Sequence, residues 1–147
     1  MSVFDSMVFA EIDELTPTHF QEDHHQLPVR AAEVVLDGGT GRSERLFDVL
    51  LPLLRDEIHI VEFARGVSDD GELYICGALL RREDGTVVIH IKDAAIGYHG
   101  SGADLSRHVL TALNVPSDVF EKINEKAQAT RRPNGTPHYD IVLRLHQ

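Results

Sequence analysis

The chain is poor in cysteine and lacks any long apolar run, and each shortage argues against a class of protein. Cys76 is the only cysteine among 147 residues, so no disulfide forms within the chain and secretion into an oxidising space is not indicated. No apolar run approaches the ~20 residues that a membrane helix needs. Residues 1–5 contain neither a basic nor an apolar segment, which predicts that no signal peptide is present. We therefore expect a soluble, cytoplasmic protein that does not enter a membrane.

Positive charge is also scarce. Lysine and arginine number 14 against 24 aspartates and glutamates, which gives a formal net charge of −10 at pH 7. Such a field repels nucleic-acid phosphates, whose binding depends on lysine and arginine, and only the pairs Arg81-Arg82 and Arg131-Arg132 form small basic clusters. We expect no direct nucleic-acid binding. The charge suits a basic protein partner, although acidity that only maintains solubility is the simpler explanation.

Length and composition predict a single globular domain over residues 1–147. Hydrophobic residues make up 42% and charged residues 26% of the chain, which is ordinary for a folded protein. A domain of this size buries roughly 70% of its extended-chain surface, so it folds without a metal or a disulfide. No repeat, low-complexity tract or long linker divides the sequence.

Three strand signals follow one another in the middle of the chain. Residues 58–64 and 86–92 alternate between apolar and polar, and residues 72–80 form an apolar run. The connections 68–71 and 83–85 have the aspartates and glycines of hairpin turns. These strands are expected to form an antiparallel meander.

Further strands are expected near both ends of the chain. Residues 7–12 predict a first strand, and residues 29–36 fit either a strand or a helical turn. Residues 139–145 predict a last strand. Its apolar face consists of Tyr139, Ile141, Leu143 and Leu145.

The clearest helix precedes the meander. Its apolar residues recur at i, i+3, i+4, i+7 and i+8, and they are Leu46, Val49, Leu50, Leu53 and Leu54. Thr40 or Ser43 is a candidate cap for its start, and Pro52 predicts a kink or an early end because proline lacks the amide donor.

Two later helices complete the prediction of an α+β domain. Residues 102–113 and 117–130 have helical periodicity and follow the meander. Helices segregated from hairpin-linked strands indicate an antiparallel sheet of about four to five strands, with a central meander and helices packed on one face. The other face is expected to be polar, carrying His90, Lys92, Asp140 and Arg144.

A glycine-rich connection between the meander and the first late helix is the best candidate site. Residues 96–104 read Ile-Gly-Tyr-His-Gly-Ser-Gly-Ala-Asp, with three glycines in six residues. Glycine lets a ligand approach the main chain, and a helix N-terminus offers free N–H groups to an anion. The spacing matches neither the Walker phosphate loop nor the dinucleotide-binding loop.

Two explanations of the glycine-rich loop, residues 97–104, remain open. In one it holds a nucleotide or another phosphate-bearing molecule on its N–H groups, while Tyr98 stacks and His99 or Arg107 adds charge. In the other it is a tight turn, in which Ser101 caps the helix and Asp104 reaches back to the main chain. The first explanation predicts a ligand site at Tyr98, His99, Gly100, Ser101, Gly102, Asp104, Arg107 and His108.

Histidines supply a second set of candidates. His108 lies one helical turn after Asp104, and His99 is near in sequence, so the three form an acid–base or metal group if they converge. An exposed histidine beside an aspartate is the simpler explanation, and we expect no metal or cofactor. Cys76 lies in an apolar run, which indicates an unreactive core thiol.

The leading hypothesis for function is a non-enzymatic, acidic domain that engages a protein partner, as immunity, antitoxin or inhibitor proteins do. It depends on the negative charge and on the lack of a complete catalytic constellation. A small-ligand module at residues 97–104 is the alternative. A hydrolase or transferase that uses Asp104, His99 and His108 is a third class.

Overall fold

Three hairpin-linked strands form the middle of the sheet, as the alternation of the sequence predicts. In the computed structural model, which describes residues 12–14, 32–67, 73–129 and 139–145, they are β3 (Ile60–Val67), β4 (Leu73–Arg81) and β5 (Val87–Ile91). Each pairs antiparallel with the next. Gly85 has a φ of +91° in the turn between β4 and β5, a conformation that favours glycine. The other expected turn, residues 68–71, lies outside the described residues.

Three further strands flank the meander. The strand β6 (Tyr139–Arg144) pairs antiparallel with β3, and β1 (Ile12–Glu14) pairs antiparallel with β6. On the opposite edge, β2 (Val34–Leu36) pairs parallel with β5, which makes the sheet mixed, in the order β1-β6-β3-β4-β5-β2. The strand alternative for the end of residues 29–36 is therefore confirmed, whereas residues 29–31 and 7–11 lie outside the described part.

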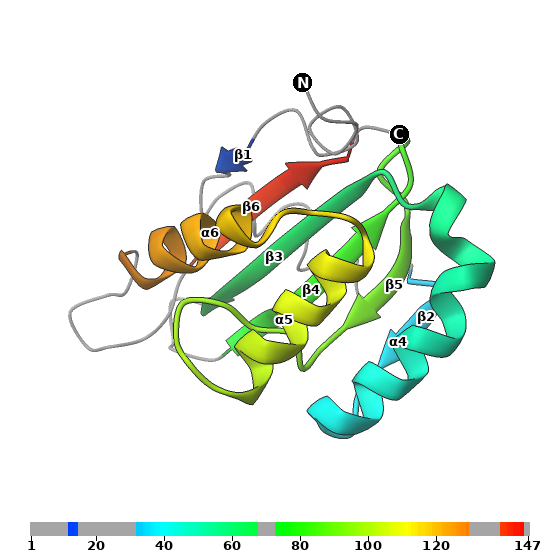
Figure 1. The fold of residues 1–147 in the computed structure, drawn as a ribbon, viewed down its shortest axis with the longest axis horizontal. Helices are drawn as coiled ribbons and strands as arrows, with labels where there is room; N and C mark the ends of the chain where they lie inside the picture. The colour runs from blue at the N-terminus through cyan, green and yellow to red at the C-terminus, as the bar shows by residue number, and fades with distance from the viewer. Residues whose placement is uncertain (1–11, 15–31, 68–72, 130–138, 146–147) are drawn as a thin grey trace.

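Three helices lie on one face of this sheet, which confirms the α+β class. They are α4 (Thr40–Leu54), which continues into the 3-10 helix η2 (Arg55–Glu57), α5 (Ser101–Ala112) and α6 (Ser117–Ala129). In Figure 1, α5 and α6 cross in front of the sheet, and α4 lies beside the edge strand β2. No helix in the described part of the chain is long and apolar enough to cross a membrane.

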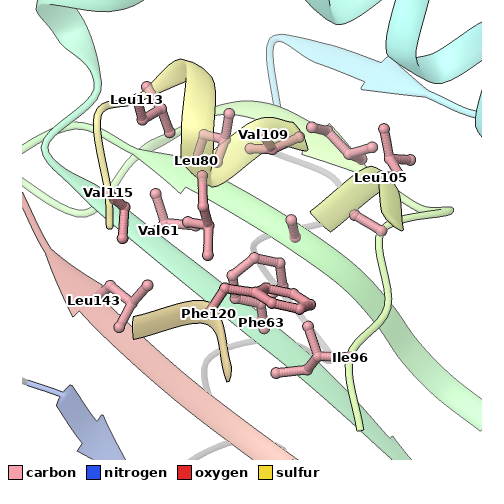
Figure 2. Packing of buried hydrophobic residues seen from close by; sticks show 14 of the residues in the cluster. Val61, Phe63, Leu80, Ile96, Leu105, Val109, Leu113, Val115, Phe120 and Leu143 are labelled. Atoms are coloured by element: carbon pink, nitrogen blue, oxygen red, sulfur yellow. The ribbon is translucent and has the colours of Figure 1, made fainter. Parts of the chain in front are cut away.

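The main core fills the space between the helices and the sheet. Figure 2 shows strand side chains facing those of α5 and α6, with Phe63 near Phe120. Alternation in β6 directs Tyr139, Ile141 and Leu143 into this core, and Leu145 packs against it, as expected. The fully buried residues of largest volume are Phe47, Phe63, Phe120, Ile58, Leu79, Leu80, Ile89, Ile91, Ile96, Leu110 and Ile123.

The opposite face of the sheet is not the polar surface expected from the sequence. His90 and Glu62 are each only 2% exposed, and a second apolar cluster of Ala64, Leu79 and Val87 lies on this side. The strand β5 lies inside the sheet, between β4 and β2, and is buried along its whole length, so both of its faces are covered. Of the other predicted residues, Lys92 and Arg144 are exposed, and the side chain of Asp140 lies outside the description.

The start of α4 is capped from another part of the chain. Gly39 is the N-cap residue and makes no side-chain capping bond, so the expectation of Thr40 or Ser43 as the cap is wrong. Instead Asp93, which follows β5, accepts hydrogen bonds from the Ser43 hydroxyl at 2.7 Å and from the Gly39 N–H at 3.2 Å. A carboxylate at this position satisfies an orphan amide and interacts favourably with the helix dipole. A cap from so distant a residue leaves no local sequence signal.

The face that α4 turns to the core also differs from the predicted stripe. Its buried residues are Ser43, Phe47 and Leu51, while Val49 and Leu53 are 68% and 76% exposed. Leu46, Leu50 and Leu54 are partly buried. The apolar residues cover more than one side of the helix, so packing on the sheet selected the side that contains Phe47. The helix also runs two residues past Pro52, beyond the early end that proline predicted.

Candidate functional site

The glycine-rich loop connects the sheet to α5 and is held at several points by buried side chains. The Ile96 N–H donates to the Tyr139 hydroxyl at 3.2 Å, and the Gly97 N–H donates to Oδ1 of Asn124 at 2.6 Å. The side-chain amide of Asn124 donates in turn to the Tyr98 carbonyl at 3.3 Å. Gly97 has a φ of +91°, which explains a glycine at this position. Side chains of α6 and β6 therefore hold the loop in place through hydrogen bonds to its main chain.

Tyr98 occupies the space that the next two glycines leave free. A Cβ atom at Gly100 would lie 2.6 Å from Cε2 of Tyr98, and a Cβ atom at Gly102 would overlap the Tyr98 hydroxyl. Gly100 has an extended backbone that any residue adopts, with φ 171° and ψ −174°, so contact with the ring requires glycine there. The two glycines therefore make room for the Tyr98 ring, which lies where the ligand hypothesis expects an anion to bind.

The first turn of α5 forms hydrogen bonds with the loop and with the residues that precede it. Gly100 is the N-cap residue, and its carbonyl accepts a hydrogen bond from the Asp104 N–H at 2.9 Å. The predicted cap by Ser101 is wrong, because no side chain caps this helix and Ser101 is exposed within the first turn. The buried hydroxyl of Ser106 donates to the carbonyls of Ala95 at 2.7 Å and Gly102 at 3.1 Å.

Arg107, a predicted source of positive charge for a ligand, joins α5 to α6. Its guanidinium lies 2.9 Å from the Glu121 carboxylate and 3.8 Å from that of Asp104. The guanidinium carbon also lies 4.7 Å from the centre of the Phe120 ring, within cation–π range. Two carboxylates and an aromatic face thus already surround this arginine, which leaves less of its charge for an anion.

His108 contacts α4 instead of the loop. Its Nε2 lies 2.6 Å from the Asp48 carboxylate, its Nδ1 lies 3.4 Å from that of Glu44, and its ring meets Phe47 edge-on. Asp104 is near Arg107 instead, and His99 is exposed. Among the described residues, no group of three or more histidine, cysteine, aspartate and glutamate side chains is placed to hold a metal. The side chain of Cys76 lies outside the described part.

A buried ion pair on the second sheet face was not predicted from the sequence. Glu62 accepts hydrogen bonds from Arg81 at 2.8 Å, and Arg81 also donates to the Gly85 carbonyl at 2.7 Å. The Glu62 side chain is 2% exposed and that of Arg81 is 15% exposed. Glu62 and Arg81 come from neighbouring strands, and a single glutamate between apolar residues in β3 was the only sequence signal. The pair fixes the turn after β4, and nothing about it indicates catalysis.

The most exposed apolar surface lies on the side of α4 that faces away from the sheet. It consists of the exposed Val49 and Leu53, with the partly buried Leu46 at its edge toward the core, and we call these three residues the α4 outer stripe. Val49 and Leu53 are the most exposed large apolar side chains of the described residues, and Val35 on β2, at 44%, is the other one. Exposed apolar residues that recur at helical spacing are typical of a surface that contacts another protein.

Comparison with known proteins adds no function to this geometry. No protein-family model, no curated protein and no solved structure matches the chain. Ligand binding at residues 97–104 therefore stays a prediction, and the packing of Tyr98 over Gly100 and Gly102 argues against it.

Proposed function

We propose that this chain is a non-enzymatic binding domain that engages a protein partner through the α4 outer stripe. The observation that carries the proposal is the exposure of Val49 and Leu53, at 68% and 76%, one helical turn apart on a helix whose other side enters the core. Burying a leucine or valine side chain that was exposed contributes about 1.5–3 kcal/mol, so a partner that covers both gains substantially.

The surroundings of the candidate catalytic and ligand residues support a binding role over an enzymatic one. His108 is engaged by Asp48 and Glu44, and Arg107 by Glu121. The loop glycines accommodate Tyr98. An acyl- or phosphoryl-transfer site needs a nucleophile or base within reach of stabilising donors, and these residues instead bond to neighbouring elements of the fold.

The charge of the whole chain favours a basic protein as a partner. The net charge of −10 makes a positively charged partner more favourable than a nucleic acid. Within α4 the charges balance, since Arg42 and Arg45 oppose Glu44 and Asp48. The acid excess therefore lies outside α4, where it increases the rate of encounter with a basic protein while the apolar stripe supplies contact area.

A capture experiment with matched variants tests the proposal. The full chain is used as bait beside Val49→Gln/Leu53→Gln, which keeps good helix formers on the exposed face, and beside Val35→Thr as the control for an exposed apolar residue elsewhere. We expect the wild type and the control to bind a protein that the double variant loses. Because Val49 and Leu53 are exposed, the free energy of unfolding of the double variant should differ from that of the wild type by no more than about 0.5 kcal/mol.

Recovery of the same proteins by the wild type and by the folded double variant would contradict the proposal. The interaction must then be measured between purified proteins at two salt concentrations. Weakening by salt is the expected behaviour for a basic partner, since exposed charges are screened over about 8–10 Å at ordinary ionic strength.

A further inference from the structure

Two aspartates in the described part of the chain directly precede a glycine, and the structure restrains the two pairs differently. They are Asp37-Gly38, in the connection between β2 and α4, and Asp84-Gly85, in the turn between β4 and β5. An aspartate before a glycine is chemically labile, because glycine has no side chain that would keep its amide away from the neighbouring carboxyl group. Whether such a pair reacts in a folded protein depends on how the two groups are held.

The Asp37 carboxyl group lies against the amide that follows it. Both residues are exposed, and the Gly38 N–H donates a hydrogen bond to Oδ1 of Asp37 at 2.8 Å. The carboxyl carbon is one bond from that oxygen. Bonds form from separations of about 3–3.5 Å between the reacting atoms, so rotation of this exposed side chain is enough to bring the Gly38 nitrogen against the carboxyl carbon. Among the described residues, no other group forms a hydrogen bond or an ion pair with this carboxylate.

In Asp84-Gly85 other residues restrain both groups. The Asp84 carboxylate accepts hydrogen bonds from the Thr86 N–H at 3.0 Å and from the Thr86 hydroxyl at 2.8 Å. The Gly85 N–H donates to the Arg82 carbonyl at 2.9 Å. The bonds from Thr86 also lower the pKa of Asp84, which keeps its carboxyl group ionised. Attack on the Asp84 carboxyl carbon therefore requires these hydrogen bonds to break and the carboxylate to take up a proton.

We propose that Asp37-Gly38 is a site at which the main chain isomerises spontaneously through a cyclic imide. The Gly38 nitrogen forms a bond to the carboxyl carbon of Asp37, and the hydroxyl of the protonated carboxyl group leaves with the amide proton as water. A water molecule then opens the ring. Attack of this water on the main-chain carbonyl carbon of Asp37 gives isoaspartate, in which the chain runs through the side-chain carboxyl group, and attack on the other carbonyl carbon restores aspartate. The steps need no oxidant and no cofactor.

Isoaspartate at this position lengthens the main chain by one carbon shortly before α4. The N-cap residue of the helix, Gly39, lies two residues further, where its N–H donates to Asp93 at 3.2 Å and its carbonyl accepts from the Ser43 N–H at 3.0 Å. The added carbon displaces the segment that these bonds hold. We therefore expect isomerisation to loosen the first turn of α4, the helix that carries the α4 outer stripe.

Ageing of the purified full chain at about pH 6, in its native state and in urea, tests the assignment. Trypsin releases the two sites on separate peptides, residues 31–42 and 83–92, and isoaspartate in each is measured by mass spectrometry and by enzymatic methylation. In the native chain isoaspartate should form at Asp37 roughly tenfold faster than at Asp84, because reaction at Asp84 requires charge-assisted hydrogen bonds to break. In urea these restraints are lost, and the two rates should be similar. A third pair, residues 70–71, lies outside the described residues and is released on another peptide.

Two variants provide matched controls. Asp37→Glu keeps the charge, but its longer side chain has to close a larger and less favourable ring, so no isomerised product should form at this position. Amides of α4 should exchange hydrogen faster in the aged wild type than in Asp37→Glu aged in parallel. Thr86→Val removes one hydrogen bond to Asp84 and should speed isomerisation there a few-fold, without changing the rate at Asp37.

Equal rates at Asp37 and Asp84 in the native chain would overturn the assignment, and so would a native chain in which Asp37 reacts far more slowly than it does in urea. Isoaspartate at position 37 without faster exchange in α4 would refute the loosening of the helix. Capture of a partner by freshly purified chain does not depend on these results, so the proposed function stands or fails separately.

Discussion

Replacement of Gly100 by alanine tests whether the glycine-rich loop exists to seat Tyr98. The three atoms nearest to a Cβ at Gly100 all belong to the Tyr98 ring, the first of them at 2.6 Å. The backbone at Gly100 is extended, so alanine adds no conformational strain of its own. Only displacement of the ring admits the methyl group.

The magnitude follows from the burial of Tyr98. Overpacking a filled site costs about 1–3 kcal/mol, and because Tyr98 is only half-buried its ring moves partly into solvent, which places Gly100→Ala at about 1–2 kcal/mol. Tyr98→Ala removes the packed ring and should cost about 1–3 kcal/mol. Tyr98→Ala removes the three atoms nearest to the methyl group at position 100, so the double variant should be no less stable than Tyr98→Ala alone.

Urea unfolding followed by circular dichroism measures this double-mutant cycle. The double variant should be more stable, by about 1–2 kcal/mol, than the sum of the two single changes predicts. Independent sites depart from additivity by only roughly 0.3–0.5 kcal/mol. Additive free energies, or a Gly100→Ala variant as stable as the wild type, would refute the steric explanation. An anion whose binding stabilises the wild type and is lost in Gly100→Ala would instead support the ligand hypothesis.

Three further predictions concern stability. Arg81→Met leaves the buried Glu62 carboxylate without its guanidinium and should cost about 3–5 kcal/mol in urea unfolding, whereas the double variant with Glu62→Leu should recover most of this loss. Hydrogen bonds from the N–H and hydroxyl of Thr86 lower the pKa of Asp84 below 3.8, so the ionised carboxylate stabilises the fold above that pH and loses this effect as the pH falls through the lower folded-state pKa. In a pH series of thermal unfolding, the stability difference between the wild type and Asp84→Asn should therefore become smaller below pH 3.8. A constant difference would contradict this prediction. Pro52→Ala restores an amide donor inside α4 and should raise the unfolding free energy by about 1–3 kcal/mol, and an unchanged midpoint would show that the last turn is not strained.

Local periodicity explains why most elements could be predicted. Strands β3 and β5 alternate, α5 and α6 have helical spacing, and the observed helices begin and end within one residue of the expected positions. In β6 the alternation also predicted the side that enters the core, at Tyr139, Ile141 and Leu143. These features depend on neighbours within one or two turns, which the sequence contains directly.

The candidate site was less predictable, because its chemistry depends on residues distant in sequence. The sequence showed the glycines of the loop. It did not show that the Tyr98 ring fills the space beside Gly100 and Gly102, or that Asn124 accepts a hydrogen bond from the Gly97 N–H. His108 was expected beside Asp104, one turn away, and instead lies beside Asp48 of another helix. Spacing along a helix limits which side chains are able to meet, and the packing of helices decides which ones do.

The sequence by itself determined the class of the fold, the meander, the two late helices and the acidic charge. Only the tertiary structure decided that α4 turns Phe47 inward and Val49 outward, that Asp93 caps this helix, and that His90 and Glu62 are buried on the second sheet face. The physical reason is the range of the interactions. Hydrogen bonds and periodicity within an element are local, whereas burial is shared among elements, and a helix with more apolar surface than one face presents its excess to solvent or to a partner.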